Sequence, residues 1–270
     1  MARETRRSLS RSEKSGRRNR KRGAGDGILE LHNPHSVLAV IHTRPESVLS
    51  VEVSRHPTDA WRQVAAAAGR ARIAVHTGSA SRSSERASRD TERQASSRAM
   101  VRQPIPVSLD ELLGTVEADC SGVWLALDQI QDPQNLGTIF RSAAFFGVRG
   151  IVVSRNRSAP VNATVCDVAA GGVEHVPFCV VTNLARSLDD VRNAGLWTLG
   201  SSEHSQTDIL AIDRDRPWIL VLGNEQTGLR RLTLEKCDEV CRLSPRGSLT
   251  SLNVAVAAGS LLTVLTAPAS

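Results

Sequence analysis

Residues 218–232, WILVLGNEQTGLRRL, pass from an unbroken apolar run into a polar turn that contains Asn224 and Glu225. An apolar run of this kind is typical of a strand that is buried on both faces of a parallel sheet. In an open α/β sheet, ligands bind beyond the carboxyl ends of the strands. The turn is therefore a candidate binding site, although one such turn does not define a function.

Apolar segments recur after residue 121 and alternate with amphipathic helical patterns. Continuous apolar strands separated by helices predict a parallel sheet covered on both faces. We therefore expect an α/β domain over residues 119–270. Its expected strands lie in GVWLALDQI, RGIVVS, HVPFCVV, LWTLGS, WILVLG and EVCRLS.

A smaller α/β unit is predicted over residues 26–103. In this unit SVLAVI, SVLSVEV and ARIAVH are strand-like or buried segments, and DAWRQVAAAAG has the pattern of a helix closed by Gly69. Residues 79–102 are rich in Ser and Arg and predict a mobile loop, which is either a solvated connector or a segment that follows a phosphate backbone. Residues 104–118 are expected to link the two units.

The net charge of +6 is unevenly placed along the chain. Residues 1–25 hold ten of the 34 Lys and Arg but two of the 28 Asp and Glu, so this segment carries +8 and the rest carries −2. A segment so charged and so poor in apolar residues is expected to be a disordered arm. The arm either attracts nucleic acid without specificity or serves as a solubilising tail.

Neither a membrane span nor a secretion signal is expected, because no apolar run reaches about 18 residues and the basic N-terminus lacks a following apolar stretch. We therefore predict a cytoplasmic protein. The five cysteines are scattered and odd in number, which favours reduced core residues over a disulfide framework. Cys237 and Cys241 are four residues apart without a second Cys or His pair nearby, so we expect no metal site.

A second polar cluster lies in LDQIQDPQNLGTIFRSAAFFG. Asp132 and Pro133 predict the start of a helix, and Gly147 predicts its end. On an ideal helix, Asn135 and Arg141 lie about 240° apart. They converge only if Asn135 is in the entry loop and Gly137 allows close backbone approach. Otherwise the Asn is a cap and the Arg lies on a solvated face.

The third cluster, LSPRGSLTSLNVAVAAG, places Ser251 and Asn253 before an apolar helix, which either residue could cap. Other common signatures are absent from the sequence. It contains no G-x-G-x-x-G after a strand, no Walker loop, no H-E-x-x-H and no G-x-S-x-G. The usual nucleotide-binding and hydrolase functions are therefore disfavoured.

Taken in order, the three clusters resemble the motifs of the SpoU (TrmH-type) RNA 2′-O-methyltransferases of the SPOUT class. NLGTIFR is similar to the N-x-G-x-x-x-R motif, VLGNEQTGL to G-x-E-x-x-G, and SLNVAVA to S-L-N-V-x-x-A. RSAPVNATV and GGVEHVP further resemble the branch of the family that methylates guanosine in bacterial 23S rRNA. The resemblance covers residues 123–265.

The resemblance implies a parallel sheet whose C-terminal segment forms a deep trefoil knot, a rare exception to unknotted topology. It implies S-adenosylmethionine as the cofactor, no metal, and a homodimer with the site near the subunit interface. Residues 26–103 would be an RNA-recognition domain similar to ribosomal protein L30e. The implied cofactor-binding residues are Leu199, Gly200, Gly223, Leu243 and Leu252.

The resemblance also implies roles for the polar residues. A ribose 2′-hydroxyl is a poor nucleophile and must be positioned and helped to lose its proton. Arg141 is the family's candidate for this task, either as a base or as a cation that stabilises the alkoxide or a phosphate; we favour the cation, because an ordinary Arg is always protonated. Glu225 is expected to pin a guanidinium away from bulk water. Hydrogen bonds from the remaining polar residues would orient Arg141, the ribose and the cofactor, and these residues are Asn135, Glu225, Ser251 and Asn253.

The N-terminal half departs from the family pattern, because RQA at residues 93–95 stands where relatives often have His-Gln-Gly. With no Tyr and four Phe, recognition is expected to use RNA shape, ribose and phosphate more than base stacking. Three hypotheses follow: methylation of a 23S rRNA guanosine, methylation of a tRNA ribose, or a non-catalytic role in RNA binding or ribosome assembly. The four Trp residues are expected in the core, at positions 61, 124, 197 and 218.

Overall fold

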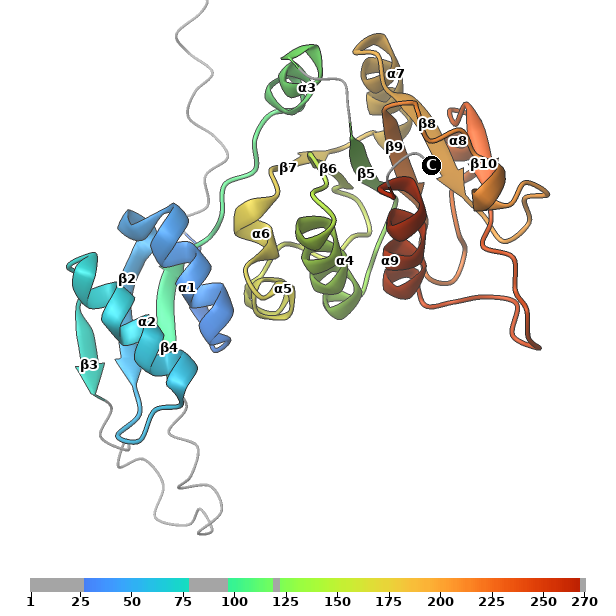
Figure 1. Ribbon diagram of the computed structural model, residues 1–270. Coiled ribbons are helices and arrows are strands. Elements are labelled where there is room, and N and C mark those ends of the chain that lie inside the picture. Colours follow the sequence, from blue (N-terminus) through green and yellow to red (C-terminus); the bar gives the residue numbers. More distant parts are fainter. Residues whose placement is uncertain (1–26, 78–96, 119–121, 268–270) are drawn as a thin grey trace, which may run out of the picture.

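The structure, a computed structural model, describes residues 27–77, 97–118 and 122–267 (Figure 1). The basic segment 1–25, the residues RQA at 93–95 and Cys120 lie outside the described residues. The expectations for them stay predictions.

The C-terminal half contains a six-stranded sheet with the strand order β10-β8-β9-β5-β6-β7. Every neighbouring pair is parallel. The six strands correspond to the six apolar segments of the sequence, so this part of the prediction is confirmed. They are β5 (Val123–Leu127), β6 (Ile151–Ser154), β7 (Phe178–Val181), β8 (Trp197–Ser201), β9 (Trp218–Leu222) and β10 (Glu239–Cys241).

Alternate residues of these strands belong to two separate hydrophobic clusters, one on each face of the sheet. In β5, Leu125 and Leu127 pack into one cluster, whereas Trp124 and Ala126 pack into the other. Helices α4 (Pro133–Phe145), α5 (Ala163–Ala169) and α9 (Val254–Leu265) contribute to the first cluster. Helices α3 (Leu109–Ala118) and α7 (Leu184–Asn193) contribute to the second. Coverage of both faces is therefore confirmed and explains why the strands are apolar throughout.

Helix α4 begins and ends where its sequence signals predict. Asp132 is the N-cap, its side chain accepts a hydrogen bond from the backbone N–H of Gln134, and Pro133 occupies the first turn. The helix ends at Phe145, and Gly147 follows with a φ of +68°. Asn253 caps α9 by accepting from the backbone N–H of Ala255. These caps fix the entry of both helices beside the carboxyl ends of the strands.

The N-terminal half is a four-stranded mixed sheet with the order β1-β4-β2-β3. Helices α1 and α2 pack with it, and α1 lies beside α5 and the short helix α6 of the C-terminal half (Figure 1). The elements are β1 (Ile28–Leu31), α1 (Pro34–Thr43), β2 (Val48–Val53), α2 (Asp59–Arg70), β3 (Val75–Thr77), β4 (Arg98–Arg102) and α6 (Gly172–His175).

Three expectations for this half need correction. SVLAVI, expected to be strand-like or buried, is buried but belongs to a helix, and the Asn33 side chain caps this helix through the N–H of His35. Gly69 lies inside α2, which continues to Arg70. Residues 98–102, assigned to the mobile loop, form β4 between β1 and β2, where Ala99 and Val101 are buried. The charged residues of β4 conceal its apolar alternation.

Two further expectations differ from the structure. The segment 104–118 is not simply a linker, since it contains α3, whose Leu112 and Val116 are buried against the sheet. Trp197 is 42% exposed, unlike the other three Trp residues, because it begins β8 near the edge of the sheet. The Arg216 guanidinium lies 4.3 Å from the centroid of its ring.

The described cysteines agree with the prediction of reduced core residues. Cys166, Cys179, Cys237 and Cys241 are free thiols, and burial raises the pKa of each to about 12. Within the described ranges, no group of three or more His, Cys, Asp or Glu side chains could hold a metal ion. No helix in those same ranges is long and apolar enough to cross a membrane.

Candidate active site at the ends of the central strands

One residue from each of the three polar clusters meets the others in a hydrogen-bonded chain. Asn135, in the first turn of α4, donates from Nδ2 to Glu225 Oε1 at 3.1 Å. Asn253 donates from its own Nδ2 to Asn135 Oδ1 at 2.9 Å. Asn135 is 8% exposed, and both its amide nitrogen and its amide oxygen are hydrogen-bonded. Segments 90 and 118 residues apart in sequence are thereby joined at one point.

Glu225 receives four N–H donors. Its Oε1 accepts from Asn135 and from the backbone N–H of Asp132 at 3.3 Å, and its Oε2 accepts from Gln131 N at 3.4 Å and Asn224 Nδ2 at 3.2 Å. Partial burial alone would raise the pKa of this carboxyl, but the bonds from Asn135 and the backbone lower it below its ordinary value. Among the described residues, amide groups and no guanidinium bind Glu225, and the residue is exposed, so the expected guanidinium contact stays a prediction.

The lowered pKa predicts how Glu225→Gln changes stability with pH. A carboxyl with a depressed native pKa stabilises the fold above its ordinary pKa of about 4.3 and loses that contribution as pH falls through the native value. The variant should therefore be less stable than the wild type by a constant amount at about pH 6–8, and the difference should shrink below about pH 4. Urea denaturation at each pH measures it. A difference that grows on acidification would contradict the assigned hydrogen bonds.

The turn after β9 is closed on itself and is hydrogen-bonded to the segment that follows β5. Asn224 and Gly228 exchange two backbone hydrogen bonds of 3.0 Å, and Asn224 Nδ2 donates to the carbonyl of Gln129 at 2.8 Å. A Cβ on Gly223 would lie 2.3 Å from the carbonyl carbon of Gly228. The glycine is therefore required by the packing of the turn.

Asp128 is a site residue that the sequence analysis missed. Its side chain is fully buried at the end of β5 and accepts from Arg230 Nε at 2.8 Å and Nη2 at 2.6 Å. This ion pair fastens the far end of the turn that carries Glu225. The sequence does contain a signal for this ion pair. An acidic residue follows a buried strand directly, a basic pair lies at residues 230–231, and charged side chains are rarely buried without a partner of opposite charge.

The expected cofactor residues lie on neighbouring elements. Leu199 and Gly200 are buried in β8, next to β9, which ends before Gly223. A Cβ on Gly200 would lie 2.9 Å from Cys237 Sγ. Leu243 is half-buried against the core, and Leu252 is 54% exposed directly before Asn253. The expected cofactor residues thus come from β8, the turn after β9 and the segment after β10, and Leu252 among them presents an exposed apolar side chain.

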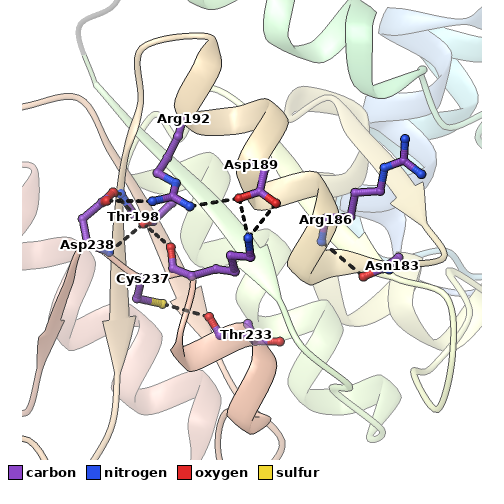
Figure 2. A network of polar contacts seen from close by, with 9 residues as sticks. Asn183, Arg186, Asp189, Arg192, Thr198, Thr233, Cys237 and Asp238 are labelled. Atoms are coloured by element: carbon purple, nitrogen blue, oxygen red, sulfur yellow. Dashed lines mark hydrogen bonds and ion pairs between the residues drawn. The ribbon is translucent and has the colours of Figure 1, made fainter.

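A polar network fastens the start of β8 (Figure 2). Asp238 Oδ2 accepts from the Thr198 backbone N–H at 2.9 Å and from its hydroxyl at 2.7 Å. Arg192 of α7 bridges Asp238 and Asp189, at 3.3 and 2.9 Å. Hydrogen bonds lower the pKa of the Asp189 carboxyl, and the bond from Lys236 has a larger effect than the bond from Arg192. The network holds the segment before β10 against α7 and β8.

Arg141 and Ser251 are not part of the hydrogen-bonded chain. Arg141 is exposed on α4, and its side chain makes no hydrogen bond or ion pair within the described residues. Asn135 lies inside the helix and not in its entry loop, so the two side chains point apart as the ideal geometry predicts. Gly137 faces α5, where a Cβ would lie 2.7 Å from Val168 Cβ. Ser251 is exposed in the loop before α9.

Solved structures share this fold over most of the chain. The SpoU methyltransferase AviRb from Streptomyces viridochromogenes matches with a TM-score of 0.70 at 23% identity, covering 89% of each chain. The structure of the same protein in complex with the cofactor AdoMet matches with a TM-score of 0.70 at 22% identity, covering 89% of this chain and 90% of that one. The chain therefore shares the fold of these two structures.

The SpoU rRNA Methylase family matches residues 122–263, which include all three polar clusters. The chain therefore belongs to the SpoU rRNA methylase family. The 23S rRNA (guanosine-2'-O-)-methyltransferase RlmB of Pseudomonas aeruginosa is 44% identical over 154 residues, covering 57% of this chain and 61% of that protein. That alignment spans less than two thirds of the relative. RlmB of Bordetella pertussis is 34% identical over 229 residues, covering 84% of this chain and 92% of that protein.

Proposed function

We propose that the protein transfers a methyl group from S-adenosylmethionine to a ribose 2′-hydroxyl of RNA, and that its substrate is a guanosine of 23S rRNA. The observation that carries the proposal is the hydrogen-bonded chain through Asn135, Glu225 and Asn253, which joins all three family motifs at one place. Relatives that are matched over up to 92% of their own length are named as enzymes of this activity, which supports the substrate.

The residues present fit the cofactor. In the proposed site, the backbone at Gly223, Leu199 and Gly200 would hold the polar groups of S-adenosylmethionine, and the exposed Leu252 with the half-buried Leu243 would cover its adenine. When bound, the cofactor supplies a methyl group that is activated by the positive charge of its sulfonium sulfur. The closed turn at residues 223–228 keeps this wall of the site rigid.

Arg141 is proposed to stabilise the alkoxide that develops on the ribose oxygen, or the neighbouring phosphate. A guanidinium stays protonated at neutral pH, which suits a stabilising cation better than a base. Its lack of a partner within the described residues leaves its donors free for RNA. Asn135, Glu225 and Asn253 would position α4 and the turn, and Ser251 would contact the ribose from the loop before α9.

We further propose that the C-terminal segment forms the trefoil knot of the family. The chain after β10 pairs with the connection between β8 and β9, since Arg242 N donates to Thr207 O and Ile209 N donates to Arg242 O. The same segment continues into α9, which packs beside α4 (Figure 1). This path from the edge of the sheet to its centre supports a threaded topology.

A homodimer is proposed to form across α4 and α9. Apolar side chains on these helices or in the loop before α9 are exposed: Phe145 is 82% exposed, Leu249 79% and Val256 54%. Arg141 is exposed on the same helix as Phe145. A second copy would remove these side chains from water, at about 25 cal/mol per Å² of apolar surface buried.

The N-terminal half, residues 26–103, is proposed to be the L30e-like domain that recognises RNA. Its mixed α/β architecture supports this role, as do the guanidinium groups of Arg55, Arg70 and Arg72, which have no carboxylate partner among the described residues. An enzyme of ribosomal RNA works where ribosomes are assembled, so the predicted cytoplasmic location follows from the proposed substrate.

The proposal is tested by transfer of radiolabelled methyl from S-adenosylmethionine to total rRNA and tRNA that lack native modification, followed by mapping of the labelled ribose. Label at one guanosine of large-subunit rRNA is the expected result. Label in tRNA would replace the substrate but keep the reaction. Cofactor binding without any transfer, also to ribosome-assembly intermediates, would favour the non-catalytic RNA-binding hypothesis.

A further inference from the structure

Two consecutive glycines lie between the N-terminal half and the helix that carries Arg141. Gly171 has a φ of +99°, and a Cβ there would lie 2.8 Å from Ala39 Cβ on α1. A Cβ on Gly172 would lie 2.6 Å from the carbonyl oxygen of Phe140 and 3.0 Å from Arg141 Cα. The turn therefore contacts α1 on one side and the backbone of Arg141 on the other, with no room for a side chain at either glycine.

A buried ion pair holds this turn to the N-terminal half. Arg44, at the end of α1, donates from Nε to Glu174 Oε2 at 2.6 Å and from Nη2 to Glu174 Oε1 at 2.8 Å. The two side chains are 18% and 7% exposed. Arg44 Nη1 also donates to the carbonyl of Arg102 at 2.7 Å, so the guanidinium is fixed from both sides. Removal of one partner would leave a buried charge without compensation.

A second contact between the halves lies one helix earlier. The Asp167 carboxylate in α5 accepts from the backbone N–H groups of His32 and Asn33 at 3.0 Å, and Asn33 Nδ2 donates to the Asp167 carbonyl at 2.7 Å. Asn33 is also the cap of α1. Helix α1 is therefore bound near its start to α5 and near its end to α6, and both of these helices pack on α4.

We propose that Glu174 is a positioning residue for methyl transfer. Through its ion pair with Arg44, it seats residues 171–174 against Phe140 and Arg141, so that the placement of the N-terminal half sets the placement of Arg141. RNA bound by the N-terminal half would thereby be coupled to the helix that performs the chemistry. This inference rests on the proposed function.

The test uses the full chain and compares the wild type with Glu174→Ala and with the exchanged pair Arg44→Glu/Glu174→Arg. The matched control is Glu239→Ala, which removes an Arg–Glu pair with Arg216 at 3.2 Å at the opposite edge of the sheet. Three quantities are measured: kcat at saturating RNA, the KM for S-adenosylmethionine, and amide hydrogen exchange of residues 133–145 without RNA.

Glu174→Ala should lower kcat roughly tenfold, because small displacements of a catalytic group are costly. Its KM for the cofactor should stay within about twofold, since the strands that would hold the cofactor are not displaced. Amide hydrogen exchange in α4 should become faster. The charge-swapped pair Arg44→Glu/Glu174→Arg should restore part of the kcat and part of the protection from hydrogen exchange. Glu239→Ala should match the wild type in all three quantities. Should Glu174→Ala not fold, Glu174→Gln provides the same comparison with its shape retained.

An unchanged kcat for Glu174→Ala beside an active wild type would overturn the inference, as would equal loss in the exchanged pair and the single variant. If the wild type itself methylates no RNA, the proposed function fails. Hydrogen exchange in α4 still decides in that case whether the ion pair positions the helix.

Discussion

Arg141→Ala is expected to lower the rate of methyl transfer to RNA by about 10²–10³, the loss typical when one preorganised donor to a developing oxyanion is removed. Folding should be unaffected, because Arg141 is exposed and has no partner among the described residues. The rate is measured under single turnover with unmodified rRNA, and binding of S-adenosylmethionine is measured separately. Cofactor affinity should stay near that of the wild type.

Two further variants test whether the loss of activity is specific to the Arg141 guanidinium. Arg186→Ala is the matched control, because Arg186 lies on α7 and its guanidinium points away from the surrounding network (Figure 2). It should methylate normally. Arg141→Lys retains the charge without the planar fork, so partial activity indicates a stabilising cation. Normal methylation by Arg141→Ala would overturn the proposed mechanism.

Gly223→Ala is expected to be the most destabilising substitution at the site. Its Cβ would lie 2.3 Å from both the Gly228 carbonyl carbon and the Leu229 nitrogen, which are backbone atoms that no rotamer change can move away. Overpacking usually costs about 1–3 kcal/mol, and a clash with backbone should reach the upper end or exceed it. Chemical denaturation measures the loss, and binding of S-adenosylmethionine should fall with it.

Gly69→Ala is the control for this glycine substitution. Gly69 lies inside α2, and a Cβ added there would meet no described atom within 4 Å. Ala is favoured over Gly in a helix by about 1 kcal/mol. This variant should be at least as stable as the wild type. Wild-type stability in Gly223→Ala would show that the turn can open, contrary to its close packing.

The parallel sheet could be predicted because burial on both faces makes each strand apolar along its whole length, as in WILVL. The N-terminal half was harder to predict. A short, mostly apolar segment such as SVLAVI is compatible with a helix or a strand, and only the preceding Asn33–Pro34 pair indicates the helix. Strand β4 depends on pairing with β1 and β2, which are distant in sequence, and no local pattern reports that pairing.

The candidate site, like the fold, could be predicted only in part. Asn135, Glu225 and Asn253 come together as the strand-end argument and the family resemblance indicate. The full set of donors to Glu225 could not be predicted, because two of the four are the backbone N–H groups of Gln131 and Asp132, which almost every residue type presents. Asp128 was missed because its partner, Arg230, lies 102 residues away.

The two capped helices at the site have an electrostatic consequence. Helices α4 and α9 run in the same direction, since Asn135 meets Asn253 and Ser142 lies near Gly259. Their N-termini, each equivalent to about half a positive charge, therefore converge beside the Glu225 carboxylate. The carboxylate neutralises a field that would otherwise attract any small anion. Under the proposed function, this end of the site would be nearly neutral, and Arg141 would supply the positive charge for a phosphate or alkoxide of RNA.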